Sequence, residues 1–187
     1  MTKIAIWCRH TGDNVIGIGP DIPWHVSSDF KRFKRLTTGH HLVAGQTTYE
    51  SFPNRTLPNR FIHILTFDKD YQVSDSSKHF VHTDFHDFDN FEHDLFIVGG
   101  ASIYKLFMQN TSTLPDVIID SEYLPDLSDK FTGTPVDITP CIEAMHTHYQ
   151  RVSSPDLSDN IITTVWVKKG ITPPVILNHI FNAIHQQ

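Results

Sequence analysis

Cysteine is scarce in this sequence, with Cys8 and Cys141 as the only two thiols in 187 residues. Two thiols do not make a disulfide framework, and they offer no paired ligands for a zinc site. No His-Glu-x-x-His pattern is present either, so we expect no metal site. This cysteine usage is typical of a reducing compartment, and we expect the protein in the cytoplasm.

Long apolar runs and an excess of positive charge are also absent. No stretch approaches the roughly 20 apolar residues of a membrane-spanning helix, and the apolar start KIAIW is too short for a signal peptide. The formal net charge is -6 with no basic block, which argues against binding to nucleic acid or to a membrane surface. The length and the 39% hydrophobic content predict one soluble domain, or one domain with an appendage.

Short apolar segments alternate with helical patterns along most of the chain. Strands are expected at 3–7, 40–45, 61–66, 78–82, 94–100 and 116–124, and helices at 27–38, capped by Ser27 or Ser28, and at 101–110. Residues 9–23 read as a loop, and 146–152 and 160–169 read as a closing strand pair. This order predicts an α/β sheet that binds ligands beyond the carboxyl ends of its strands.

The last segment differs from the rest of the chain. It follows Gly170 and a double proline, and its apolar residues recur at helical spacing: Ile176, Leu177, Ile180, Phe181 and Ile184. We therefore expect residues 1–169 to form the main domain. Residues 170–187 are expected to form an amphipathic helical extension that packs on the body or on a partner.

Glycines follow two of the expected strands. Gly45 precedes Thr47 and Thr48, where a helix start would offer free backbone N–H groups and hydroxyls to a phosphate. The alternative is that a threonine simply caps a short helix. Gly99 and Gly100 either let a ligand approach the backbone closely or form a tight strand-to-helix turn.

Asp29 stands in the first turn of an expected helix, among Trp24, Phe30 and Phe33. An acid at that position often does no more than favour the helix dipole. If Asp29 faces an apolar pocket that Ile6 also lines, burial raises its pKa and suits it to proton chemistry near neutral pH. Such an acid would also bind adjacent N–H donors of an aminopyrimidine ring.

The stretch VIGIGPDIPWHVSSDFKRFKRLTTGHHLVAGQTTYESF, then LPNR, then IVGGASIY, resembles the dihydrofolate reductase family in order and spacing, from residue 3 to residue 168. The resemblance implies a twisted, mostly parallel eight-stranded sheet with flanking helices and an antiparallel C-terminal strand. It also implies hydride transfer from NADPH to dihydrofolate, with Asp29 promoting protonation of the pterin and Trp24 ordering a water. The segment from Gly12 to Pro23 would be the mobile loop that closes over the nicotinamide.

The resemblance implies two sets of binding residues. Those for the substrate are Ile6, Cys8, Phe30, Phe33, Phe52, Leu57, Arg60, Val98, Tyr104 and Asp120, with Arg60 on the glutamate carboxylate of folate. Those for the cofactor are Ile16, Gly17, Gly45, Gln46, Thr47, Thr48, Leu65, Thr66, Phe67, Gly99, Gly100, Ala101, Ser102 and Ile103. From the residues alone, Arg60 at the start of a strand could equally be a surface residue. We expect a monomer, with the C-terminal helix as a possible self-association surface.

Three positions depart from the family pattern at the cofactor. Gln46, Phe67 and Ser102 stand where relatives often carry groups that bind the 2′-phosphate of NADPH. Losing such charge-assisted hydrogen bonds, about 1.5–3 kcal/mol each, predicts a weaker preference for NADPH, so that NADH is tolerated. Lys69, His79 or His82 could compensate.

Asp120 is a further departure, because relatives usually have a threonine there that hydrogen-bonds the catalytic acid. A second carboxylate near Asp29 would raise a pKa by mutual repulsion. The alternative is a register shift of one residue, so that Ser121 takes the place of the threonine.

Histidine is abundant, with 13 residues. His146 and His148 are expected on one face of a strand, and His79, His82 and His86 are expected to cluster. A set of this size predicts stability that depends on pH near pH 6.

Two rival functions stay open. A pyrimidine reductase of riboflavin synthesis would use the same fold but would need no anchor for a glutamate, so Arg60 argues against it. A paralogue that binds a pterin or a partner without turnover would explain the departures at 46, 67, 102 and 120. The presence of Trp24, Asp29 and the glycine pair argues against that reading.

Overall fold

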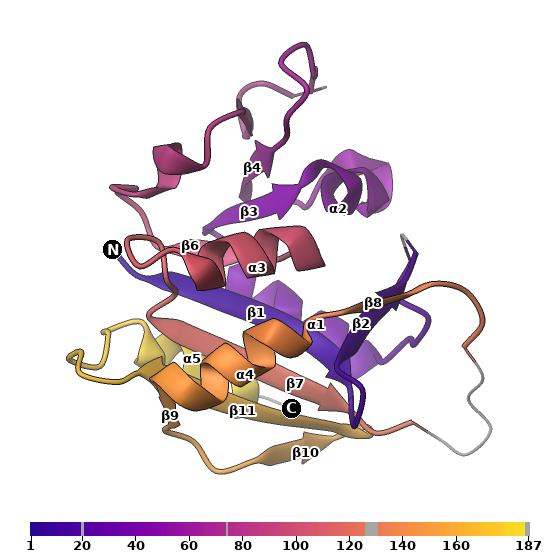
Figure 1. The fold of residues 1–187 in the computed structure, drawn as a ribbon, viewed down its shortest axis with the longest axis vertical. Helices are drawn as coiled ribbons and strands as arrows, with labels where there is room; N and C mark the ends of the chain where they lie inside the picture. Colours follow the sequence, from indigo (N-terminus) through magenta and orange to yellow (C-terminus); the bar gives the residue numbers. More distant parts are fainter. Residues whose placement is uncertain (20, 74, 126–130, 186–187) are drawn as a thin grey trace.

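A twisted sheet of mostly parallel strands runs through the middle of the molecule (Figure 1). The computed structural model describes residues 1–19, 21–73, 75–125 and 131–185. Within these residues the main sheet has nine strands, in the order β10-β11-β7-β1-β6-β3-β4-β5, with β9 also paired to β11.

The parallel strands form the centre and one side of the sheet. They are β1 (Lys3–His10), β3 (His41–Gly45), β4 (Phe61–Leu65), β5 (His79–His82), β6 (Leu95–Ile97) and β7 (Val117–Tyr123). The antiparallel strands, on the other side, are β9 (Tyr149–Arg151), β10 (Asp156–Ser158) and β11 (Ile161–Lys168). The expected α/β architecture with an antiparallel strand near the C-terminal end is therefore confirmed.

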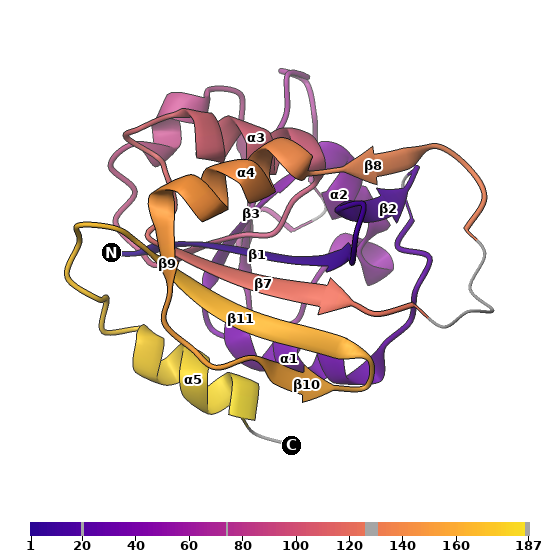
Figure 2. The same ribbon diagram turned by 60° about the horizontal axis from the view of Figure 1, so that its bottom comes forward.

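Helices cover both faces of the sheet, as Figure 2 shows. On one face, α3 (Ala101–Gln109) and α4 (Thr139–His148) bury Phe107 and Met145 against the strands. On the other face, α1 (Ser27–Thr37) and α5 (Leu177–His185) bury Leu36 and Ile180. Each helix has one apolar stripe, and the sheet is apolar on both faces, as a parallel sheet covered by helices requires.

Smaller elements sit at the carboxyl edge of the sheet and beside it. A two-stranded ribbon pairs β2 (Val15–Ile18) with β8 (Pro135–Asp137), and α2 (Gln46–Ser51) directly follows β3. Two 3-10 turns span Pro53–Arg55 and Phe85–Phe88. The expected loop at 9–23 therefore contains a strand, and Pro20 in its middle lies outside the described residues.

The expected strand at 146–152 is wrong for most of its length. Residues 139–148 form α4, with Pro140 in the first turn, and only Tyr149–Arg151 form a strand. A proline fits the first turn of a helix because its missing N–H has no partner there. His146 and His148 therefore lie in the last helical turn and not on one face of a strand.

The C-terminal helix packs on the body of the molecule. Ile176, Leu177, Ile180 and Ile184 are all buried in the same cluster as Ile4 of β1. Arg35 Nε of α1 donates to the Ala183 carbonyl oxygen at 3.1 Å. Of the two alternatives for the extension, packing on the body is the one observed; residues 186–187 of the expected extension lie outside the described residues.

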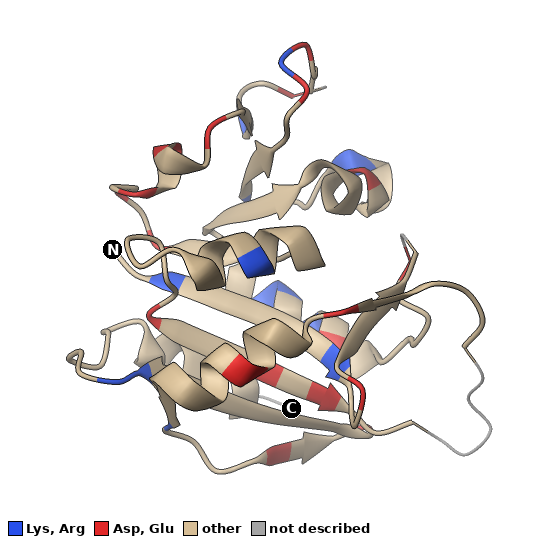
Figure 3. Cartoon of the chain, viewed as in Figure 1, with Lys and Arg blue, Asp and Glu red and all other residues tan. Residues whose placement is uncertain are grey.

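Charged positions are distributed over both sides of the sheet (Figure 3). In the described parts of the chain, no helix is long and apolar enough to cross a membrane.

Candidate active site

The carboxyl ends of β6, β3 and β4 bring three of the predicted cofactor segments side by side. The Gly45 amide donates to the Gly99 carbonyl oxygen at 2.8 Å, which joins the glycine after β3 to the pair after β6. Thr66 Oγ1, just beyond β4, donates to Gln46 Oε1 at 2.6 Å. The segments around Gly45, Thr66 and Gly99 thus lie together along one edge of the sheet, where sheets of this class bind ligands.

The glycine pair is required by close contacts. Gly99 has a φ of +104°, and a Cβ there would lie 3.0 Å from the ring of Tyr104. A Cβ on Gly100 would lie 3.2 Å from Thr48 Oγ1. The Gly99–Gly100 peptide bond is cis. Because no side chain fits here, backbone groups and the Thr48 hydroxyl form a cradle that suits a phosphate-bearing cofactor.

An apolar cluster lies beside this cradle, on the α1 face of the sheet. Ile6, Phe33, Leu57 and Val98 belong to one cluster, the last three only partly buried. The Tyr104 hydroxyl donates to the Ile6 carbonyl oxygen at 2.6 Å. The structure therefore brings together five of the ten predicted substrate residues.

Two aromatic residues of the predicted substrate set lie further out. Phe52 packs with Tyr49 in a neighbouring cluster that Leu57 also touches. Phe30 is 46% exposed, with its ring 5.3 Å from that of His25. Phe30 is thus at the rim of this region and not in its wall.

Asp29 opens α1 on the same face. The residue before the helix is Val26, with no side-chain cap, so the expected cap by Ser27 or Ser28 is wrong. The Asp29 amide instead donates to the Val26 carbonyl oxygen at 3.1 Å. Burial raises the pKa of Asp29 to about 6, although the neighbouring Arg32 guanidinium lowers it. An acid with this pKa exchanges protons near neutral pH.

Trp24 is buried and stacks on Tyr123, with ring centroids 5.4 Å apart. It also lines a hollow of about 290 Å³ together with Val15 and Ile18 of β2. Burial, and next the charge of Asp29, raise the pKa of the Cys8 thiol. The predicted catalytic pair thus lies where the β2 segment meets α1.

Arg60 is buried, although it precedes a strand near the surface. Its guanidinium donates to Thr37 Oγ1 at 3.1 Å, to the Pro58 carbonyl oxygen at 2.8 Å and to the Lys34 carbonyl oxygen at 3.3 Å. Burial lowers its pKa. A guanidinium held in this way is a fixed fork for a ligand carboxylate.

Asp120 does not face Asp29. Its carboxylate accepts hydrogen bonds from Trp7 Nε1 at 2.7 Å and from Arg9 Nε at 2.8 Å. Trp7 belongs to the cluster under α3 and α4. Alternate strand residues point to opposite faces, so Ser121, in register with Cys8, lies on the Asp29 side. The geometry argues against a pair of carboxylates. The Ser121 hydroxyl is bonded to Thr163 Oγ1 at 3.1 Å, and its role beside Asp29 stays a prediction.

The side chains around Gln46, where the 2′-phosphate is expected, are neutral or acidic. Gln46 Nε2 donates to Glu50 Oε1 at 3.2 Å, the Tyr71 hydroxyl donates to the same oxygen at 3.0 Å, and Phe67 is 98% exposed. His79 is bonded to Tyr49, and His82 to His63. Both histidines thus have partners within the protein, and compensation for Gln46 by Lys69, His79 or His82 stays a prediction.

The predicted histidine cluster is also wrong. His79 contacts the Tyr49 hydroxyl, His82 contacts Asp87, and His86 contacts Asp89. The three rings thus have separate partners. Among the residues that the structure describes, no group of three or more His, Cys, Asp or Glu side chains is arranged to hold a metal ion.

Sequence reasoning missed Arg32 and its partner Asp156 of β10. Arg32 is buried, with its NH1 3.6 Å from Asp29 Oδ1 and its NH2 3.4 Å from Asp156 Oδ2. The spacing of Asp29 and Arg32 could have indicated their contact, because residues three apart on a helix are neighbours. Nothing in the sequence pairs Arg32 with a residue 124 positions away.

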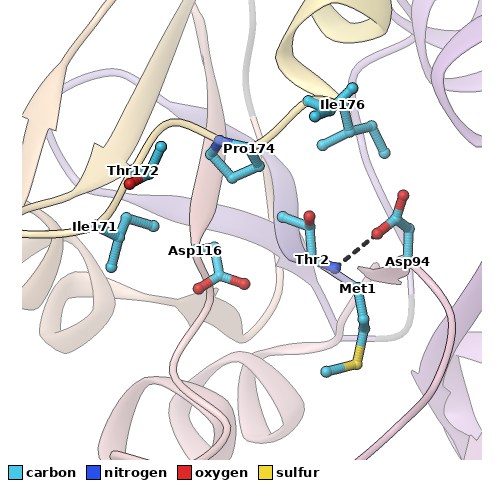
Figure 4. Close-up of a pocket in the computed structure, with 9 residues that line it drawn as sticks. Met1, Thr2, Asp94, Asp116, Ile171, Thr172, Pro174 and Ile176 are labelled. Atoms are coloured by element: carbon cyan, nitrogen blue, oxygen red, sulfur yellow. Dashed lines mark hydrogen bonds between the residues drawn. The ribbon is translucent and has the colours of Figure 1, made fainter.

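A separate hollow lies at the amino ends of the strands (Figure 4). It measures about 400 Å³, and its lining includes Thr2, Asp94, Asp116 and Ile176. The Thr2 amide donates to Asp94 Oδ1 at 2.6 Å across one of its walls. Ligands of parallel sheets bind at the opposite edge, so this hollow is not part of the candidate site.

Comparison with known proteins agrees with this geometry. The family model described as dihydrofolate reductase matches residues 3–132. A dihydrofolate reductase of Staphylococcus haemolyticus is 36% identical over 132 residues, covering 70% of this chain and 74% of that protein. One from Staphylococcus aureus is 31% identical over 130 residues, with the same coverage.

A solved structure supports the fold. Dihydrofolate reductase from Enterococcus faecalis, complexed with NADP(H) and RAB-propyl, superposes with a TM-score of 0.71 at 24% identity, covering 90% of this chain and 96% of that one. The matched family region contains Asp29 of α1, the glycine pair and the parallel strands from β1 to β7. The chain therefore belongs to the dihydrofolate reductase family.

Proposed function

We propose that this chain reduces 7,8-dihydrofolate to 5,6,7,8-tetrahydrofolate, with NADPH as the hydride donor and Asp29 promoting protonation of the pterin. The observation that carries the proposal is the position of Asp29. It is a half-buried acid whose pKa is raised to about 6, on the same face as the cluster of Ile6, Phe33 and Val98.

Asp29 binds the N3 and 2-amino groups of the pterin ring in this proposal and promotes proton delivery to N5 through a water that Trp24 orders. Burial makes this possible, because it raises the pKa of the acid toward neutral pH. Ile6, Phe33 and Val98 pack on the ring and keep the pocket dry, which strengthens the electrostatic interactions of the acid. Arg60 holds the glutamate carboxylate.

Gly45, Thr48, Gly99 and Gly100 would hold NADPH, and the close contacts of the two adjacent glycines fit that role. When bound, NADPH supplies the hydride that reduces C6 of the pterin. Ile16 and Gly17 lie in β2, and the segment from Gly12 to Pro23 would cover the reacting atoms and exclude water.

The proposal extends to the setting of the enzyme. Both cysteines are free thiols, Cys141 buried and Cys8 half-buried, as suits a reducing compartment, and we place the reaction in the cytoplasm. The apolar stripe of α5 is buried against the body, which supports a monomer.

The test is loss of the reduced-nicotinamide absorbance when purified protein is mixed with dihydrofolate and either NADPH or NADH. We expect consumption that requires both substrates. Asp29→Asn should lower the turnover rate by roughly 10²–10⁴-fold, while its thermal unfolding midpoint shows that it is folded. Absence of turnover with both cofactors would instead support a protein that binds a pterin without reducing it.

A further inference from the structure

Arg32 is a buried cation on the face of α1 that carries the catalytic acid. It is 2% exposed. Its NH1 lies 3.6 Å from Asp29 Oδ1, and its NH2 donates to Asp156 Oδ2 at 3.4 Å. Moving a guanidinium out of water is costly unless acids compensate it. Here the two acids come from α1 and from β10, which are far apart in the sequence.

Two nitrogens of this cation form no hydrogen bond. Among the described residues, the buried side-chain atoms without a hydrogen-bond partner are Trp24 Nε1, Ser28 Oγ, Arg32 Nε and Arg32 NH1. A buried ion pair often stabilises a protein no more than a well-packed apolar residue of the same size. Stability alone therefore does not account for a buried arginine with NH1 only 3.6 Å from Asp29 Oδ1 and no hydrogen bond at that nitrogen, and a role at the site does.

We propose that Arg32 is a positioning residue for the reduction, which holds the Asp29 carboxylate at the pterin pocket and is itself held by Asp156. The inference rests on the proposed function. It makes β10, an edge strand outside the expected site, part of the support of the catalytic acid.

The charges around Asp29 are few. Arg32 faces it from α1, Cys8 from β1 and Tyr104 from α3. Burial raises the pKa of Cys8 and of Tyr104, so both are neutral at physiological pH. Behind Arg32 stand Asp156 and, on the surface, His185 of α5, with its Nδ1 3.7 Å from Asp156 Oδ1. Arg32 is thus the charged group in contact with the acid.

This arrangement predicts opposite effects of two substitutions. Removing the cation in Arg32→Met leaves burial unopposed and raises the pKa of Asp29. Removing its counter-ion in Asp156→Asn leaves the Arg32 charge less compensated and lowers the pKa of Asp29. A residue that only packed the helix would change stability but would not move the titration of Asp29 in opposite directions.

The experiment follows Asp29 directly, without turnover. Its carboxyl ¹³C signal, assigned by loss in Asp29→Asn, is titrated in the wild-type protein and in each variant. We expect the midpoint to rise by about one pH unit in Arg32→Met, given the effect of an opposite charge at this distance. It should fall in Asp156→Asn. Lys31→Met is the matched control, because it removes a cation from an exposed position of the same helix.

The inference is overturned if Asp156→Asn leaves the midpoint unchanged, or if Lys31→Met moves it as much as Arg32→Met does. If Arg32→Met does not fold, Asp156→Asn decides alone. The pH profile of dihydrofolate reduction should move with the titration. If the titration shifts as expected but no protein turns over, the contact between Arg32 and Asp29 stands and the proposed function fails.

Discussion

Two opposing effects act on the pKa of Asp29. Burial raises it and the Arg32 charge lowers it, and the resulting pKa is about 6. If the protonated acid promotes the reaction, its active fraction falls as the pH rises above 6. The single-turnover rate of nicotinamide oxidation should then fall by about tenfold per pH unit. Stopped-flow absorbance measures it. The same slope in Asp29→Asn would show that another group titrates.

Gln46 should control the choice of cofactor. Gln46→Arg restores a charge for a 2′-phosphate, worth about 1.5–3 kcal/mol, or roughly 10–100-fold in the ratio of kcat/KM for NADPH over NADH. Glu50 lies 3.2 Å from the Gln46 amide and would capture the new arginine. We therefore expect the full gain only with Glu50→Gln added.

Steady-state kinetics with both cofactors checks this expectation. Glu50→Gln alone is the control for removal of the acid. A wild-type enzyme that already prefers NADPH strongly would contradict the weakened selectivity inferred from Gln46, Phe67 and Ser102.

Single positions differ in how far the sequence determines them. Asp29, Gly99 and Gly100 were predictable, because an acid among aromatic residues and glycines after a strand are local signals. Asp120 and Ser121 could not be separated, because a register shift of one residue moves a side chain to the other face of a sheet. Arg32 was missed because its burial depends on β10.

At the scale of elements, a row of histidine side chains joins three neighbouring parallel strands, β3, β4 and β5. His41 of β3 lies 2.9 Å from His63 of β4, nitrogen to nitrogen, and His63 lies 2.8 Å from His82 of β5. His82 in turn contacts Asp87 at 2.8 Å. Burial, and next the charges of His82, His41 and His93, lower the pKa of His63 to about 3.

This row of histidines should lower the free energy of unfolding at acidic pH. Unfolded histidine takes up a proton below about pH 6.5, whereas folded His63 does not until about pH 3. Stability is therefore full above pH 6.5 and falls as the pH drops toward 3, by about 1.4 kcal/mol per pH unit for each such histidine.

Urea unfolding from pH 7 to pH 4 measures the slope. His63→Gln should reduce it, and the exposed His148→Gln is the control. Equal slopes in all three proteins would contradict the assignment to His63.

Arg9 and Asp120 join β1 to β7 and to the start of β2. Arg9 also contacts Glu122 at 2.8 Å and Asn14 at 2.8 Å. Asp120→Asn removes one partner of a buried pair and should lower the free energy of unfolding by about 3 kcal/mol. Glu122→Gln, whose carboxylate is 30% exposed, should cost less than about 1 kcal/mol. Chemical denaturation compares the two, and similar costs would argue against a special role for the buried pair.

Elements with a strong apolar pattern were predictable, and those defined by tertiary pairing were not. The strands at 41–45 and 61–65 and the helix at 101–109 follow from local pattern. The β2–β8 ribbon was missed, because its two strands are four and three residues long and pair across more than a hundred positions. The alternating pattern around His146 and His148 predicted a strand. Pro140, in the first turn of α4, instead marks the start of a helix that continues through both histidines.

At the scale of the molecule, α5 completes one of the two layers. Ile180, on the inner face of α5, is fully buried, whereas Val175, just before the helix, is 89% exposed. Ile180→Ala should lower the free energy of unfolding by about 2–5 kcal/mol, and Val175→Ala should change it by less than about 0.5 kcal/mol. Urea denaturation measures both. An equal, small effect would mean that the helix is only loosely attached.

The central place of β1 has a consequence for synthesis. β1 lies between β6 and β7 in the sheet. Both of these strands come much later in the chain, so neither exists when β1 is made. Ile4, Ala5 and Ile6 are buried in the finished sheet but are without strand partners in the nascent chain. Folding that depends on such distant pairing is slow and exposes apolar surface in the meantime. The growing polypeptide thus carries an unpaired apolar strand until the later strands are made.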